Sequence, residues 1–254
     1  MRSGFEAGWR RRFEDYGHSQ EDDAGIAGWS DSGLQARVRN FLRFWQPPGT
    51  GGTWLDAGCG AGTYSRAMAG AGQRVVGLDY SVPSLLKARA RSGPATLSWS
   101  AGDATQLPFR SASFDGAICF GVLQALSDPG DAIAELSRVV RPGGQVWVDA
   151  LNAHCLPTVV KRALERARKR ERHLRYDAPR SLRRVFERHG LGRVRVMWVP
   201  ILPARAQRFQ PVFESGVMRA VLRSLPWIGS ALSHAYVVTG ERQPGSKIQV
   251  ARSS

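Results

Sequence analysis

The sequence predicts an α/β fold in which helices cover both faces of a doubly wound, seven-stranded sheet. Three observations support this prediction. Short apolar stretches alternate with longer amphipathic ones along the chain. Three glycines at alternate positions follow the first apolar stretch, and an acid ends the second. A doubly wound sheet places its ligand contacts at these strand ends. With 254 residues, 43% of them hydrophobic, the chain can bury one substantial core.

The stretch 53–79 predicts a strand, a glycine turn, a helix and a second strand. Gly58, Gly60 and Gly62 would let a ligand approach the backbone closely. Asp79 follows Gly58 by 21 residues, at the end of the second strand, where a carboxylate accepts hydrogen bonds from ribose hydroxyls. The stretch therefore predicts a nucleoside-binding unit.

The spacing of this turn excludes a dinucleotide fingerprint. The third glycine of G-x-G-x-x-G would fall on Thr63 when counted from Gly58, and on Ser65 when counted from Gly60. The leading acid, Asp56, would also repel a pyrophosphate. It suits a ligand with a positive centre and an ammonium group, and S-adenosylmethionine is such a ligand.

The remaining elements are expected in chain order. An amphipathic helix over 34–45 precedes the sheet and ends before two prolines and a glycine. Further strands are expected over 95–100, 114–121, 145–149, 193–199 and 231–240. Further helices are expected over 82–91, 129–140, 158–176, 180–189 and 210–225. Asp103 follows the third strand, and in series with Asp56 and Asp79 it is expected to contact the ligand.

Four motifs, in this order and spacing, closely resemble class I S-adenosylmethionine-dependent methyltransferases. They are the glycine turn, the segment from Asp103 to Leu107-Pro108-Phe109, FDGAICFGVLQ over 114–124 and ELSRVVRPGGQVWV over 135–148. The nearest group is that of the type 11 and ubiquinone-menaquinone methyltransferases, and the resemblance covers about residues 50–151. It implies a Rossmann-like fold, mostly parallel, whose last strand runs antiparallel beside the sixth. It also implies S-adenosylmethionine as the cofactor.

The resemblance implies which residues hold the cofactor. In these enzymes an acid at the position of Asp103 accepts the adenine amino group. The full predicted set of cofactor-binding residues is Asp56, Gly58, Cys59, Gly60, Gly62, Asp79, Tyr80, Asp103, Ala104 and Phe120.

Catalytic residues are not identified by any motif. A sulfonium is a good leaving group that needs no acid, so a base is required only if the acceptor must lose a proton. His154, after the fifth strand, is the best placed candidate, followed by Tyr16 and His18. Gln124 occupies a position where many small-molecule relatives carry histidine, and glutamine cannot take a proton.

The predicted organisation has three parts. They are an N-terminal helical arm or lid over 1–49, a methyltransferase domain over 50–240 and a flexible tail over 241–254. The domain carries a basic helical insertion over 152–190 and a second helical insertion over 200–230. In the enzymes that this chain resembles, such an arm often covers the cofactor. The acceptor site is expected to be built from 16–29, 152–156 and 199–213.

The formal net charge of +15 is unevenly distributed. Residues 161–195 contain 14 Lys or Arg against 4 Asp or Glu, a net charge of +10. Such a segment is either a solvated surface or a patch for phosphate, nucleic acid or an anionic membrane.

Three widely spaced cysteines without a C-x-x-C pair predict reduced thiols and no metal site. No apolar run of membrane-spanning length and no secretory signal occur, which predicts a cytoplasmic protein. Segment 161–195 would hold it peripherally at the inner membrane face.

Three functions are compatible with these observations. The leading hypothesis is methyl transfer to a small-molecule or lipid-linked acceptor of the quinone, polyketide or saccharide type, with segment 161–195 at an anionic membrane. An RNA methyltransferase that uses 161–195 is the alternative. Tyr176 and Phe186 are the only aromatic residues of segment 161–195, which disfavours base stacking. A non-catalytic, cofactor-binding partner protein is the second alternative. The sequence does not predict the oligomeric state.

Overall fold

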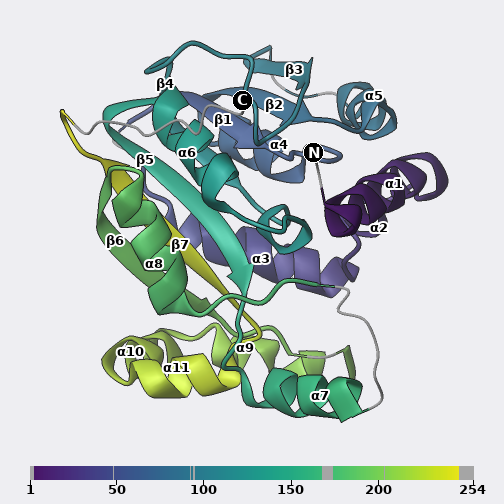
Figure 1. Cartoon of the computed structure of the whole chain (residues 1–254), viewed down its shortest axis with the longest axis vertical. Helices are drawn as coiled ribbons and strands as arrows, with labels where there is room; N and C mark the ends of the chain where they lie inside the picture. Colours follow the sequence, from purple (N-terminus) through teal and green to yellow (C-terminus); the bar gives the residue numbers. More distant parts are fainter. Residues whose placement is uncertain are drawn as a thin grey trace.

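A seven-stranded sheet runs through the computed structural model, which describes residues 3–245 except 48, 92, 94, 168–173 and 203. The strand order is β3-β2-β1-β4-β5-β7-β6 (Figure 1). The strands are β1 Thr53–Ala57, β2 Arg74–Asp79, β3 Leu97–Ala101, β4 Phe114–Cys119, β5 Val140–Leu151, β6 Leu191–Val199 and β7 Ala235–Arg242. Strand β7 is antiparallel to β5 and β6, and the other pairs are parallel. The predicted fold class is confirmed.

Three helices precede the sheet: α1 Gly4–Ser19, α2 Asp23–Ile26 and α3 Asp31–Phe44. Between β1 and β6 in the sequence lie α4 Thr63–Gly70, α5 Val82–Ala90, η1 Leu123–Ala125, α6 Gly130–Val139, α7 Leu156–Ala167 and α8 Pro179–Arg188. Between β6 and β7 lie η2 Ala204–Phe209, α9 Gln210–Phe213, α10 Gly216–Ser224 and α11 Pro226–Leu232. Figure 1 shows α1 and α2 beside α5, with α7 and α9 to α11 gathered at the opposite end of the molecule.

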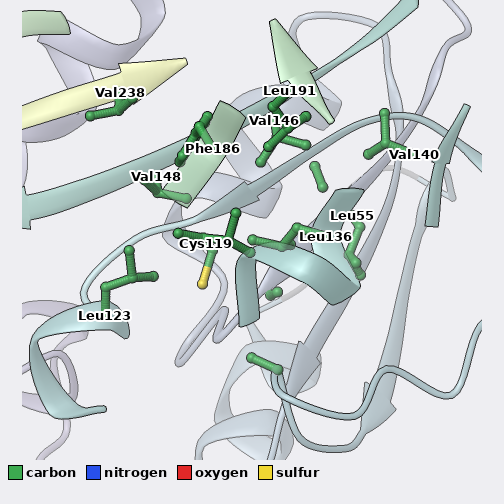
Figure 2. Packing of buried hydrophobic residues seen from close by; sticks show 14 of the residues in the cluster. Leu55, Cys119, Leu123, Leu136, Val140, Val146, Val148, Phe186, Leu191 and Val238 are labelled. Atoms are coloured by element: carbon green, nitrogen blue, oxygen red, sulfur yellow. The ribbon is translucent and has the colours of Figure 1, made fainter. Parts of the chain in front are cut away.

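The first hydrophobic core lies between the sheet and helices α6 and α8. Leu136 of α6 and Phe186 of α8 are fully buried against Val146 and Val148 of β5 (Figure 2). Leu55 of β1 belongs to the same cluster. Successive side chains of a strand point to opposite faces, so the intervening residues face the other core.

The second core covers the opposite face of the sheet and is rich in aromatic side chains. The ring of Phe41 in α3 lies 5.7 Å from Tyr64, 5.2 Å from Phe120 and 5.9 Å from Trp147, all edge to face. Such pairs stabilise beyond the area they bury, by about 0.5–1.5 kcal/mol each. This cluster fixes α3 against the sheet, directly beside the ends of β1 and β4.

Strand β5 is longer than the prediction of 145–149. Residues 141–144, which lie between the predicted helix and the predicted strand, belong to β5, with Gly143 at φ +82°. The pairing with β4 shifts register between Phe114 and Gly116, and this irregularity accommodates Gly143 and Gly144 within β5.

The predicted helix over 158–176 is wrong at its end. Helix α7 is described as far as Ala167, residues 168–173 lie outside the described residues, and 174–176 are not helical. Arg175 donates its backbone N–H to Gln124 and its guanidinium to Asp177, and these tertiary contacts hold the segment extended.

Three further boundaries differ from the prediction. The helix expected over 210–225 is divided into α9 and α10, because the hydroxyl of Ser215 caps α10 by accepting from Met218 N at 3.2 Å. The strand expected over 231–240 begins at Ala235, since the residues up to Leu232 belong to α11. The expected tail over 241–254 contributes its first two residues to β7, and 246–254 lie outside the described residues.

Candidate active site

The glycine turn joins β1 to α4 at the carboxyl edge of the sheet. Gly58, Gly60 and Gly62 have φ values of +79°, +52° and +83°, a region that other residues rarely adopt. Gly58 N donates to Leu78 O at 2.7 Å, which ties the turn to β2. A Cβ atom on Gly58 would lie 2.1 Å from Cγ2 of Val122. Glycine at this position is therefore required by both backbone and packing.

Asp79 ends β2 and braces the same turn. Its Oδ2 accepts from Gly60 N at 2.8 Å, and its Oδ1 accepts from Ser81 N at 2.8 Å. Burial raises the pKa of this carboxyl, and the backbone hydrogen bonds oppose that rise. Tyr80 is a third backbone donor, so the carboxylate retains one further lone pair for a ligand.

Asp103 follows β3 and is held by residues distant in sequence. Its Oδ1 accepts from the N and Oγ1 of Thr105 at 2.8 and 2.7 Å, and its Oδ2 accepts from Nη1 of Arg10 at 2.9 Å. Burial acts to raise the pKa of Asp103, but the hydrogen bonds from Thr105 and Arg10 lower it overall. The Arg10 guanidinium also lies 4.4 Å over the ring of Tyr80. Helix α1 thus reaches the third strand.

These groups line one cavity of about 1250 Å³. Pockets for one small ligand usually span about 300–1000 Å³, so this cavity has room for two ligands. The predicted cofactor residues that line it are Gly58, Cys59, Gly60, Asp79, Tyr80, Asp103, Ala104 and Phe120.

Asp56 and Gly62, the other two predicted cofactor residues, do not line the cavity. Asp56 is 1% exposed and accepts from Ser65 Oγ at 2.6 Å, so it points toward α4. Burial raises its pKa to about 7. Asp56 therefore anchors the helix that follows the turn.

Helix α1 forms a wall of the cavity that no sequence motif indicated. Its lining residues are Ser3, Glu6, Trp9, Arg10 and Phe13. They recur at intervals of three and four, which places them on one face of the helix. This spacing is the one signal in the sequence that could have identified them.

Helix α2 is tied directly to the helix that the glycine turn begins. Asp23 accepts from Thr63 Oγ1 and from the guanidinium of Arg66, both in α4. Its Oδ1 also pairs with Arg91 Nη1 at 2.6 Å. This network holds Ile26 and Trp29, which line the cavity, beside the glycine turn.

A buried ion pair fixes the opposite side of the cavity. Arg37 Nη1 donates to Asp149 Oδ2 at 2.9 Å, and both side chains are buried. Asp149 Oδ1 accepts from Gly121 N at 2.7 Å, and the Arg37 guanidinium lies 4.4 Å over the Trp29 ring. The pair thereby positions Trp29 and the backbone after β4.

The three predicted bases lie elsewhere. Tyr16, His18 and His154 are not among the lining residues, and both histidines are exposed. Among the carboxylates that do line the cavity, Glu6 accepts from Ser127 N at 2.8 Å, and Glu135 pairs with a neighbouring arginine in α6. The geometry therefore gives no support to a base at the predicted positions.

The predicted acceptor segments are brought together only in part. Residues 23–29 contribute to the cavity, but 152–156 and 199–213 contribute no lining residue. The segment before α10 is held against α3 instead, where Glu214 pairs with Arg39 and Arg43 at 2.9 and 3.2 Å. Asn152 is turned toward α11 and donates to Ser230 O at 2.7 Å.

No cluster of His, Cys, Asp and Glu that could hold a metal ion occurs within the described ranges. All three cysteines are buried free thiols. Burial raises the pKa of Cys59 and of Cys119, which keeps these thiols protonated.

The sequence comparisons agree with this site. Residues 55–148 match the family model of a methyltransferase domain. The matched segment spans 94 of the 254 residues. It contains the glycine turn, Asp79 and Asp103, and it ends within β5.

Curated relatives match the methyltransferase domain over about 100 residues. A malonyl-[acyl-carrier protein] O-methyltransferase of Pseudescherichia vulneris is 42% identical over 103 residues, which is 41% of this chain and 40% of the relative. A demethylmenaquinone methyltransferase of Renibacterium salmoninarum is 45% identical over 95 residues, 37% of this chain and 39% of the relative. The match spans about two-fifths of the length of these relatives.

Solved structures share the fold over most of the chain. Phosphoethanolamine N-methyltransferase 2 of Haemonchus contortus, in complex with S-adenosyl-L-methionine, has a TM-score of 0.64 at 18% identity and covers 91% of this chain and 60% of its own. Geranyl diphosphate C-methyltransferase of Streptomyces coelicolor has a TM-score of 0.63 at 15% identity, with coverages of 94% and 98%. At these identities the likeness shows a shared fold and nothing more.

Proposed function

We propose that this protein transfers the methyl group of S-adenosylmethionine to a small-molecule or lipid-linked acceptor of the quinone, polyketide or saccharide type. One observation carries the proposal. The glycine turn after β1, Asp79 after β2 and Asp103 after β3 come from adjacent strands of a methyltransferase domain and line the same cavity. Nucleoside ligands bind at this edge of doubly wound sheets.

The lining residues fit this cofactor. The glycines leave backbone atoms accessible at the turn. A Cβ atom on Gly58 would clash with Val122. Asp79 would accept the ribose hydroxyls, while Asp103 and the ring of Tyr80 would hold the adenine. Asp103 is partly engaged by Arg10, so adenine would have to displace this guanidinium.

The cofactor supplies an electrophilic methyl group on a good leaving group. The protein has to hold the acceptor in line and keep water out. Proximity of this kind is worth on the order of 7 kcal/mol. Trp29, fixed by Arg37, and Phe120, fixed by Phe41, are rigid walls suited to that task.

Apolar side chains in the cavity lining support an acceptor with an apolar body. Trp9, Phe13, Ile26, Trp29 and Leu126 line it, and they come from α1, from the α2 region and from the segment after η1. Apolar walls with a few polar groups are the usual lining of small-molecule sites. One relative, a demethylmenaquinone methyltransferase, is named for an acceptor with an apolar part.

Two finer expectations stay proposals. One is contact of segment 161–195 with an anionic membrane, and its residues 168–173 lie outside the described residues. The other is a cytoplasmic location. No helix in the described part of the chain is long and apolar enough to cross a bilayer.

Methyl transfer can be tested with S-adenosylmethionine labelled in its methyl group. The purified chain is incubated with a naphthoquinol, an acyl thioester with a free carboxylate and a reducing-end saccharide, each with and without an apolar tail. We expect label in at least one acceptor, and more with the tail than without it. Phe13→Ser should lower this preference for the tail, because Phe13 lines the apolar wall. Arg11→Ser, an exposed change on the same helix, is the control.

The same assay separates the alternatives. Label transferred to RNA and to none of the small molecules would support an RNA methyltransferase and contradict the proposal. Bound cofactor without transfer to any acceptor, including a cell extract, would favour a non-catalytic partner protein.

A further inference from the structure

Exposed apolar side chains concentrate at one end of the molecule. Thirteen large hydrophobic residues in the described part of the chain are exposed, and ten of them lie between residues 156 and 232. Val217 is 77% exposed and Trp227 is 69% exposed, so neither belongs to a core. The ten residues are Leu156, Val159, Val160, Leu164, Phe209, Val212, Val217, Leu225, Trp227 and Leu232. We call this set the apolar end.

The helices that carry the apolar end are joined to one another. Asn152, just before α7, donates from Nδ2 to Ser230 O at 2.7 Å and to Ser233 O at 2.8 Å, at the end of α11. Thr158 of α7 shares a hydrogen bond of 3.2 Å with His234 Nδ1. Figure 1 shows α7, α9, α10 and α11 together, beyond the carboxyl end of β5. The exposed residues therefore belong to one region of the surface.

The elements that carry the apolar end also have a net positive charge. Residues 156–167 and 204–232 contain 7 Lys or Arg against 2 Asp or Glu, a net charge of +5. Arg223 is exposed on α10, between Val217 and Trp227 in sequence. Arg208 lies with its guanidinium 4.7 Å over the ring of Phe209. Cations and apolar groups are thus interleaved.

We propose that the apolar end docks on the surface of an anionic phospholipid membrane. Tryptophan is enriched at the membrane–water interface, and Trp227 stands exposed in the first turn of α11. The exposed aliphatic side chains would enter the boundary between headgroups and acyl chains. The arginines would remain at the level of the lipid phosphates, attracted by the negative surface potential.

The composition of the apolar end disfavours two other partners, a second copy of the chain and a nucleic acid. A second copy of the chain would bring two ends of the same positive charge together, which is repulsive. Nucleic acid would be bound through its phosphates and through stacking, and neither uses exposed valine and leucine. A membrane surface offers both an apolar layer and negative charge.

Docking does not depend on the proposed methyl transfer, because it requires no turnover and no residue that lines the cavity. The two proposals can therefore fail separately. A chain that binds vesicles without methylating any acceptor would retain this inference, and a soluble methyltransferase would lose it.

Co-sedimentation of the full chain with vesicles tests the docking. Vesicles of phosphatidylcholine alone are compared with vesicles that contain about one-third phosphatidylglycerol, at low salt and at about 0.5 M salt. We expect binding to the anionic vesicles at low salt, and a partition coefficient at least about tenfold lower at high salt or without phosphatidylglycerol. The double variant Val217→Ser/Trp227→Ser should bind about tenfold more weakly at low salt.

Leu86→Ser is the matched control, because Leu86 is 61% exposed on α5, remote from the apolar end (Figure 1). It should change the partition coefficient by less than about twofold. Far-ultraviolet circular dichroism and the midpoint of urea unfolding establish that each variant is folded. Absence of binding to anionic vesicles at low salt would overturn the proposal, and so would an equal loss in Leu86→Ser. A dimer that dissociates in the double variant, without vesicle binding, would assign the surface to self-association instead.

Discussion

Arg10 of α1 donates from Nη1 to Oδ2 of Asp103, 93 positions later in the chain, at 2.9 Å. The same guanidinium covers the ring of Tyr80, whose hydroxyl lies 3.4 Å from the Arg10 carbonyl oxygen. A planar cation stacked on Tyr80 and bonded to Asp103 makes the two contacts that an adenine would make there. In the proposed function, Arg10 and the cofactor therefore compete for one place.

Removing this guanidinium should tighten cofactor binding. The pair is partly exposed, with side-chain exposures of 32% and 21%, so its contribution is about 0.5–1 kcal/mol. We expect Arg10→Ala to lower the dissociation constant for S-adenosylhomocysteine about two- to fivefold, measured by calorimetry. Arg11→Ala, on the exposed side of the same helix, should leave it unchanged. Weaker binding by Arg10→Ala would show that Arg10 holds the cofactor instead of competing with it.

Asp79→Ala should weaken cofactor binding by about 1.5–3 kcal/mol, because charge-assisted hydrogen bonds to the ribose are lost. Asp115→Ala is the control, since Asp115 also accepts from a backbone N–H, that of Thr53, at 2.7 Å, but does not line the cavity. Both variants should lose some stability in urea. If Asp115→Ala weakened binding as much as Asp79→Ala, the ribose assignment would be lost.

Gly58→Ala should destabilise the fold for two reasons, the positive φ and the clash with Val122. The backbone part is about 1–2 kcal/mol. Gly51→Ala isolates it, because Gly51 has the same φ of +79° and no atom within 4 Å of an added Cβ. We expect Gly58→Ala to lower the free energy of unfolding more than Gly51→Ala does. The variant Gly58→Ala/Val122→Ala should recover part of the difference, and no recovery would mean that the clash is relieved elsewhere.

Asp56 should make the folded protein less stable as pH rises. Its pKa is raised from 3.8 to about 7 by burial, so the folded state holds a proton that the unfolded state releases between these values. The contribution of Asp56 is present below the unfolded pKa and is lost as pH rises through about 7. Asp56→Asn keeps an acceptor for Ser65 and removes the titration. Urea unfolding from about pH 4 to about pH 8 should show a smaller decline in Asp56→Asn, and an equal decline would contradict the raised pKa.

The meeting of the glycine turn, Asp79 and Asp103 at one cavity could be predicted from the sequence because its signals are local. Gly58, Asp79 and Asp103 each end or follow a strand, and parallel strands bring such ends to one edge. Asp56 lies apart from the cavity for an equally local reason. Side chains alternate along β1, so Asp56 shares the face of Trp54 and points at α4.

The wall contributed by α1, and the placement of α7 to α11 away from the cavity, could not be predicted in the same way. Arg10 meets Asp103, and Glu214 meets Arg39, across long sequence separations that no motif encodes. The contact of Glu214 with Arg39 holds the segment that follows residues 199–213 against α3. The positions of helices outside the sheet depend on such tertiary pairs, whereas the presence of the strands follows from the hydrophobic pattern.

The cofactor assignment is tested most directly by calorimetric titration of the purified chain with S-adenosylmethionine and S-adenosylhomocysteine, with NAD as the control. We predict that the first two bind with one site per chain and that NAD does not bind, because the turn lacks the dinucleotide spacing. Folded protein that binds NAD, or that binds neither adenosyl compound, would contradict the assignment of this cavity.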